Sequence, residues 1–92
     1  MFGRRKGKYF YVIVHANLIE KFRRAYREIN RIHEEEQFAE VRGEPSAIPP
    51  DLPKNTKIAV CGAYRNLCVK AQLDALKQKG YDAFIYSKAT IR

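Results

Sequence analysis

The chain has 92 residues, of which 46% are hydrophobic and 30% charged, and its formal net charge is +8. This balance is that of one folded domain with a modest core, and it excludes a disordered chain. No apolar run approaches the roughly 18 residues of a membrane-spanning helix. The run YFYVIV at residues 9–14 is also too short for a secretory signal peptide. Because two cysteines without an export signal indicate reduced thiols, we expect a soluble cytoplasmic protein.

Positive charge is concentrated at the start of the chain and in its second half. Residues 1–8 contain Arg4, Arg5, Lys6 and Lys8 and no acidic residue. Such a segment is most often a solvated, flexible arm, and its functional alternative is an arm that contacts nucleic-acid phosphates. The basic balance suits nucleic acid as a partner. It suits plain solubility equally well, because no recognised nucleic-acid-binding motif accompanies it.

The first half of the domain reads as a strand followed by a long helix. Residues 9–14 are aromatic and β-branched without alternation, which is typical of a strand buried on both faces of a parallel sheet. A helix is predicted over residues 18–39, with Asn17 as its cap and Glu20 completing a capping box. Its arginines come early and its glutamates late, which opposes the helix macrodipole. Its apolar face consists of residues at three- and four-residue spacing, namely Leu18, Phe22, Ala25, Tyr26, Ile29 and Ile32.

The second half begins with a connecting loop. Residues 42–55 hold all four prolines and therefore cannot form a helix or a central strand. The elements predicted after this loop are a strand, a helix and a strand, over residues 57–61, 67–79 and 82–86. Asn66 is the predicted cap of that helix and Gly80 its stop signal.

The order β-α-loop-β-α-β predicts a small Rossmann-like α/β unit of three mainly parallel strands and two helices. We expect it to span residues 9–92 as a single domain. A three-stranded sheet leaves two open edges, which favours a homodimer.

Chemically versatile residues follow the predicted strands. In an open parallel sheet, ligands bind beyond the carboxyl ends of the strands. That edge should gather His15, the segment 62–68, and Ser87 with Lys88. Cys68 lies at the predicted helix start, where unpaired N–H groups and a partial positive charge stabilise a thiolate. The alternative is that Cys68 is a small buried apolar residue, and Cys61 is expected in the core.

Several common site types are excluded by spacing. The segment GAYRNLCV is too short and too poor in glycine for a P-loop or a dinucleotide fingerprint. Six residues separate Cys61 from Cys68, so the pair is not a thioredoxin-like Cys-x-x-Cys motif. The two cysteines and two histidines match no zinc-ligand spacing. We therefore expect no metal site and no cofactor.

The residue types and their spacing between positions 58 and 89 resemble the pattern of a known family. The matching residues are Gly62, Ala63, Cys68, Val69, Asp74, Ala75, Leu76, Gly80 and Tyr81. About a third of the chain is thereby similar to the nucleophile region of the isochorismatase-like cysteine hydrolases, which include nicotinamidases. The resemblance implies that Cys68 is the nucleophile and that backbone N–H groups near it form an oxyanion hole. The implied oxyanion or ligand loop consists of Ala63, Tyr64, Arg65, Asn66 and Leu67.

The chain also departs from the pattern of this family. The family's Thr-Asp pair is Arg65-Asn66 here, and neither its first-strand aspartate nor its catalytic lysine has an equivalent. The nearest titratable residue is His15, which we predict as the base partner of Cys68, with a structural role as the alternative. The expected function is to bind or hydrolyse a small amide or ester through Cys68. The alternative is a non-catalytic basic α/β module that binds nucleic acid or an acidic protein.

Overall fold

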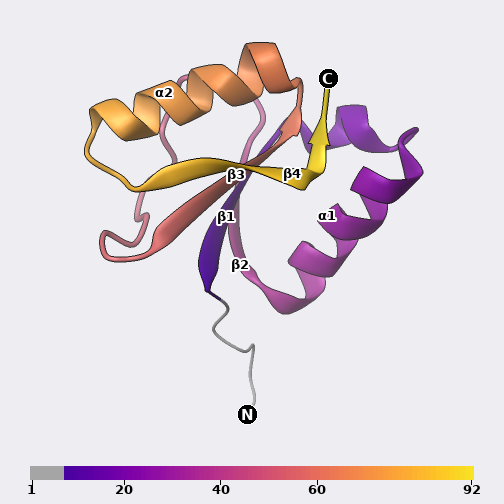
Figure 1. The fold of residues 1–92 in the computed structure, drawn as a ribbon, viewed down its shortest axis with the longest axis horizontal. Helices are drawn as coiled ribbons and strands as arrows, with labels where there is room; N and C mark the ends of the chain where they lie inside the picture. The colour runs from indigo at the N-terminus through magenta and orange to yellow at the C-terminus, as the bar shows by residue number, and fades with distance from the viewer. Residues whose placement is uncertain (1–7) are drawn as a thin grey trace.

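A computed structural model describes residues 8–92. Four parallel strands form one sheet in the order β2-β1-β3-β4 (Figure 1). The strands are β1 (Tyr9–Val14), β2 (Gln37–Val41), β3 (Lys57–Ala63) and β4 (Ala83–Ile91). The predicted α/β class and the parallel sheet are confirmed, and the sheet has a fourth strand in addition to the three that the sequence indicated.

The two helices, α1 (Arg23–Glu35) and α2 (Lys70–Gln78), cover opposite faces of the sheet (Figure 1). Side chains that alternate along β1 divide the core between these faces. Tyr11 and Ile13 belong to the buried cluster of α1, whereas Val12 and Val14 belong to that of α2. The fold therefore has three layers, and β1 and β3 lie at its centre.

The helix predicted over residues 18–39 exists, but both of its predicted boundaries are wrong, since α1 spans Arg23–Glu35. A short 3₁₀ turn, η1 (Ala16–Ile19), comes first, and Asn17 lies inside it instead of capping a helix. The helix α1 begins after Phe22 without any side-chain cap, and β2 starts at Gln37. The apolar periodicity that indicated a helix had already ended at Ile32. The following glutamates oppose the helix dipole, and pairing with β1 satisfies the backbone instead.

The helix predicted over residues 67–79 is right in place, but its beginning differs. One π-helical turn, η2 (Arg65–Val69), precedes α2, and Asn66 lies within this turn and does not cap it. Gly80 ends the helix as predicted, with φ at 93°. The N–H of Gly80 donates to the carbonyl of Lys77, and the N–H of Tyr81 donates to that of Leu76. This pair of hydrogen bonds is the Schellman arrangement.

The proline-rich segment 42–55 is a loop, as predicted. A buried glutamine on α2 holds it in place, because Nε2 of Gln72 donates to the carbonyls of Pro45 and Ala47, both at 2.8 Å. Leu52 of the loop is buried in the cluster on the α2 face. The loop thus closes the sheet on that side.

The last strand contains a large bulge. Ile85 of β4 pairs with Val60 of β3, but the next pair of the ladder joins Thr90 to Gly62. Four residues of β4 therefore face a single residue of β3, and β4 bends sharply near its end (Figure 1). The hydroxyl of Thr90 donates to the carbonyl of Tyr86 at 2.7 Å and closes the bulge. The predicted strand 82–86 is confirmed and continues beyond the bulge.

Candidate cysteine site at the carboxyl edge of the sheet

The topology places a switch point between β1 and β3. The chain leaves β1 toward α1 on one face and leaves β3 toward α2 on the other (Figure 1). Connections that diverge in this way open a crevice at the carboxyl edge between the two strands. His15 follows β1 and Tyr64 follows β3, so the segments predicted to meet at this edge do so.

Gly62 lets the two central strands approach each other closely at this edge. Its φ is 117°, a conformation that side chains rarely allow. A Cβ at this position would lie 2.0 Å from the carbonyl oxygen of Val14. Directly after it, the peptide bond between Ala63 and Tyr64 is cis. Glycine is therefore required here by the backbone itself, apart from any chemistry of the loop.

The two cysteines are in different environments, and both thiols are free. Cys61 is fully buried on β3, as expected, and its Sγ lies 3.7 Å from the carbonyl oxygen of Val12. Burial, aided by the negative charge of Glu28, raises the pKa of the Cys61 thiol. Cys68 is half-buried in η2 and packs beside the cluster on the α2 face. Of the two, Cys68 is the one that a reagent can reach.

His15 stands at the end of β1 in the left-handed conformation, with φ at 52°. Its backbone N–H donates to the carbonyl of Val41 at 2.9 Å, which ties this residue to the end of β2. Its ring atom Nε2 is buried and has no hydrogen-bond partner among residues 8–92. Within this part of the chain, no hydrogen bond joins His15 to Cys68. The structure brings the two residues to one edge but does not form the predicted pair.

The predicted oxyanion loop is the turn between β3 and α2. Ala63 is buried, and Tyr64 packs against the cluster on the α1 face. The carbonyl of Tyr64 accepts from the N–H groups of Leu67 and Val69, each at 3.0 Å. Arg65 donates to Oγ of Ser87 at 2.9 Å, which links the loop to β4.

The tip of this loop faces solvent. Asn66 is exposed, and so is Leu67, with 68% of its surface accessible. An apolar side chain with this exposure at a predicted ligand loop is available to cover a small bound molecule.

The predicted basic arm is only partly covered by the structure. Arg4, Arg5 and Lys6 lie outside the described residues. Lys8 is exposed just before β1, at the edge of the sheet opposite to His15 and Cys68. Nucleic-acid contacts by these residues therefore remain a prediction.

The structure also reveals a groove that the sequence analysis did not single out. It lies between the start of α1 and the bulged end of β4, with a volume of about 740 Å³, and Arg23, Arg24 and Lys88 contribute to its walls. The feature of the sequence that could have indicated this groove is the placement of arginines near a helix start, where they repel the helix macrodipole.

Within residues 8–92, no group of three His, Cys, Asp or Glu side chains is placed to hold a metal ion. In the same part of the chain, no helix is both long and apolar enough to cross a bilayer. Comparisons with protein-family models, with curated proteins and with solved structures find no match for this chain.

Proposed function

We propose that the protein binds or hydrolyses a small amide or ester at the carboxyl edge of its sheet, with Cys68 as the nucleophile. The observation that carries the proposal is the ring of His15, whose buried Nε2 lacks a hydrogen-bond partner among residues 8–92. His15 follows β1 at the same edge of the sheet at which the loop of Cys68 follows β3. A buried polar atom left without a hydrogen-bond partner costs about 1–3 kcal/mol and calls for an explanation such as a catalytic role. The resemblance of residues 58–89 to the cysteine hydrolases supports the same assignment.

The proposed chemistry is acyl transfer. His15 accepts the proton of the Cys68 thiol, and the sulfur attacks the carbonyl carbon of the ligand. N–H groups at the start of η2, those of Asn66 and Cys68, stabilise the negative charge that develops on the carbonyl oxygen. His15 then returns the proton to the departing amine or alcohol, and water hydrolyses the thioester. The proposal requires that ligand binding bring His15 and Cys68 within hydrogen-bond distance, as happens in enzymes whose catalytic hydrogen bonds form fully only in the complex.

A small activated ester tests the proposal. p-Nitrophenyl acetate should acetylate Cys68 and release p-nitrophenol, and mass spectrometry of the intact protein should show one acetyl group. Cys68→Ser should abolish the adduct, whereas Cys61→Ser should leave it unchanged because that thiol is buried. His15→Gln should slow acetylation by about 100-fold, the usual contribution of a general base.

Two results would count against this assignment. One is equal, slow reaction of both cysteines with iodoacetamide in the folded protein. The other is a His15→Gln variant that reacts as fast as the wild type, since His15 would then have a structural role only.

We further propose that the protein is a homodimer in the cytoplasm. Among the described residues, β2 and β4 each pair with one neighbour only, which leaves a sheet edge open on either side. The free thiols of Cys61 and Cys68 support a reducing compartment. Light scattering at tens of micromolar protein should return twice the chain mass of 10.7 kDa. A mass equal to that of one chain would refute the dimer.

A further inference from the structure

The groove between α1 and β4 has the size of a site for one small ligand unit. Its volume of about 740 Å³ lies within the range of roughly 300–1,000 Å³ that is usual for ligand sites. The first turns of α1 form one wall, and the bulge of β4 together with the residues that follow it forms the other. Four residues of the β4 wall are Ser87, Lys88, Thr90 and Ile91.

Three exposed cations point to an anionic ligand. Within residues 8–92, none of Arg23, Arg24 and Lys88 forms an ion pair with a carboxylate. A fourth cation lies next to the groove, because Arg65 donates to the hydroxyl of Ser87 in its wall. Cations from three different elements thus surround one hollow, which is the usual arrangement around a phosphate.

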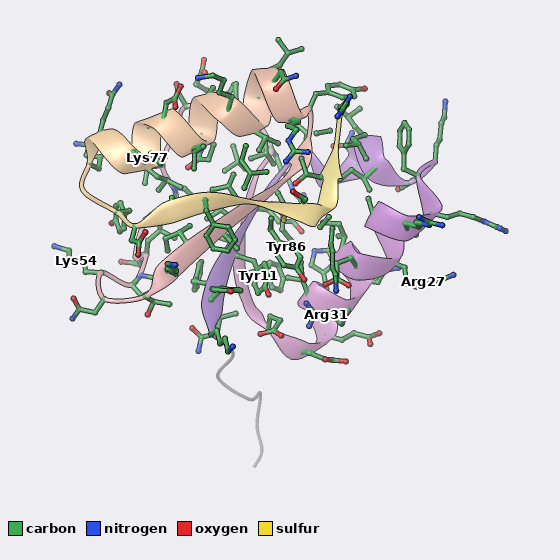
Figure 2. The ribbon with its side chains drawn as sticks, in the orientation of Figure 1. Tyr11, Arg27, Arg31, Lys54, Lys77 and Tyr86 are labelled. Atoms are coloured by element: carbon green, nitrogen blue, oxygen red, sulfur yellow. The ribbon has the colours of Figure 1, made fainter. Side chains whose placement is uncertain are left out.

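Among the described residues that line the groove, Glu28 is the single acidic one, and its carboxylate already has hydrogen-bond partners. Oε2 of Glu28 accepts from Nε and Nη2 of Arg31, at 2.9 and 2.7 Å, and from the hydroxyl of Tyr86 at 2.6 Å. Figure 2 shows Arg31 and Tyr86 close together between the sheet and α1. Lys88 adds a more distant attraction to the same carboxylate. Glu28 therefore repels an incoming anion only weakly.

The charges at the start of α1 destabilise the protein when no anion is bound. The first turn of this helix carries Arg23 and Arg24 and no acidic residue, and Phe22 supplies no side-chain cap. These cations repel the partial positive charge of the helix start. An anion in the groove converts that repulsion into attraction, which explains why the cations are tolerated there.

An aromatic ring completes the site. Phe22 lines the same groove and leaves 45% of its surface accessible, an unusual exposure for a phenylalanine. A ring of this kind beside phosphate-binding cations is the arrangement by which proteins bind nucleotides in single strands, with the base stacked on the ring. We propose that this groove binds one nucleotide unit, its phosphate held by Arg23, Arg24 and Lys88 and its base stacked on Phe22.

A matched pair of variants tests the proposal. Arg23→Gln/Arg24→Gln removes two charges from the groove, and Lys54→Gln/Lys79→Gln removes two from a smaller basic hollow that those lysines line. Lys54 lies on the far side of the molecule from α1 (Figure 2). The probe is a fluorescein-labelled oligo-dT of 12 nucleotides, followed by anisotropy at 50 mM salt.

We expect the groove variant to weaken binding at least 10-fold and the control variant less than 2-fold. The slope of log K against log salt should fall by roughly 0.7–1.4 in the groove variant only, for one or two lost phosphate contacts to a single strand. Phe22→Ala should weaken binding 5-fold or more without changing the slope, because stacking carries no charge. Cys68→Ser should bind like the wild type, so that the result is independent of the proposed hydrolase chemistry.

Competition with AMP identifies the source of the nucleotide. Displacement of the probe by millimolar AMP would assign the groove to a free nucleotide, and binding of the oligonucleotide that AMP does not displace would assign it to a single strand. Equal loss of affinity in the groove and control variants would overturn the proposal, since binding would then depend on positive charge irrespective of its position. Absence of binding by both probes at 50 mM salt would overturn it as well.

Discussion

A Cβ built on Gly62 would stand 2.0 Å from the carbonyl oxygen of Val14 and 2.7 Å from its amide nitrogen. Both contacts are with backbone, which cannot rotate out of the way as a side chain can. This approach fixes the spacing between the ends of β1 and β3, and with it the position of His15 relative to the loop of Cys68. The absence of a side chain at Gly62 therefore determines the backbone geometry of the candidate site.

Gly62→Ala should destabilise the fold by about 2–4 kcal/mol, since it combines a backbone clash with a positive φ. Gly80→Ala isolates the second cause, because φ is 93° there but nothing lies within 4 Å of the added Cβ, and it should cost about 1–2 kcal/mol. Gly43→Ala has open space and no positive φ, so it should stay within about 0.5 kcal/mol. Urea unfolding of the three variants measures these differences. The explanation fails if Gly62→Ala is as stable as Gly43→Ala.

The cluster of Glu28, Arg31 and Tyr86 should make stability depend on pH in a defined direction. Hydrogen bonds from Arg31 are the main cause that lowers the pKa of Glu28 below its ordinary value of 4.5. A carboxyl with a lowered pKa stabilises the folded state above its unfolded pKa, and this stability disappears as the pH falls through the folded pKa.

Glu28→Gln should therefore cost about 1–3 kcal/mol at pH 7, where it breaks a partly buried hydrogen-bonded pair. The difference from the wild type should begin to shrink below about pH 4.5. Urea unfolding at pH 7, 5, 4 and 3 measures it. The exposed pair of Lys70 and Asp74, 2.9 Å apart, is the control, and Asp74→Asn should change stability by less than about 0.5 kcal/mol at pH 7. A cost of Glu28→Gln that stays constant across this range would contradict the assignment.

The central strands could be predicted from sequence because they are buried on both faces. Residues of β1 and β3 are apolar in almost every position, and such runs have few alternatives. The strand β2 was missed for the opposite reason. Its sequence QFAEV is short, half-exposed and adjacent to a helix, so its conformation depends on pairing with β1, and that contact is tertiary.

The candidate site was predictable in position but not in detail. The rule for parallel sheets placed His15 and Cys68 at one edge, and the structure agrees. The left-handed backbone of His15 and the π-helical turn around Cys68 have no local signature in the sequence. Those two features decide where the side chains point. The groove of α1 and β4 likewise depends on a bulge that sequence patterns do not reveal.

The arginines at the start of α1 should lower the stability of the free protein. Each cation in the first turn opposes the macrodipole by about 0.3–1 kcal/mol at low salt, so Arg23→Gln/Arg24→Gln should be more stable than the wild type by about 0.6–2 kcal/mol. Thermal unfolding in 10 mM and 1 M salt measures this gain in stability, and high salt should erase most of it because it screens exposed charges.

Arg27→Gln is the matched control. Arg27 lies beyond the first turn and points away from the body of the molecule (Figure 2), so the gain in stability should be smaller. Saturating oligo-dT should narrow or reverse this difference, because a ligand that binds the folded wild type 10-fold more tightly stabilises it by about 1.4 kcal/mol more than it stabilises the variant. A groove variant that is less stable than the wild type in 10 mM salt would show that these arginines support the fold itself.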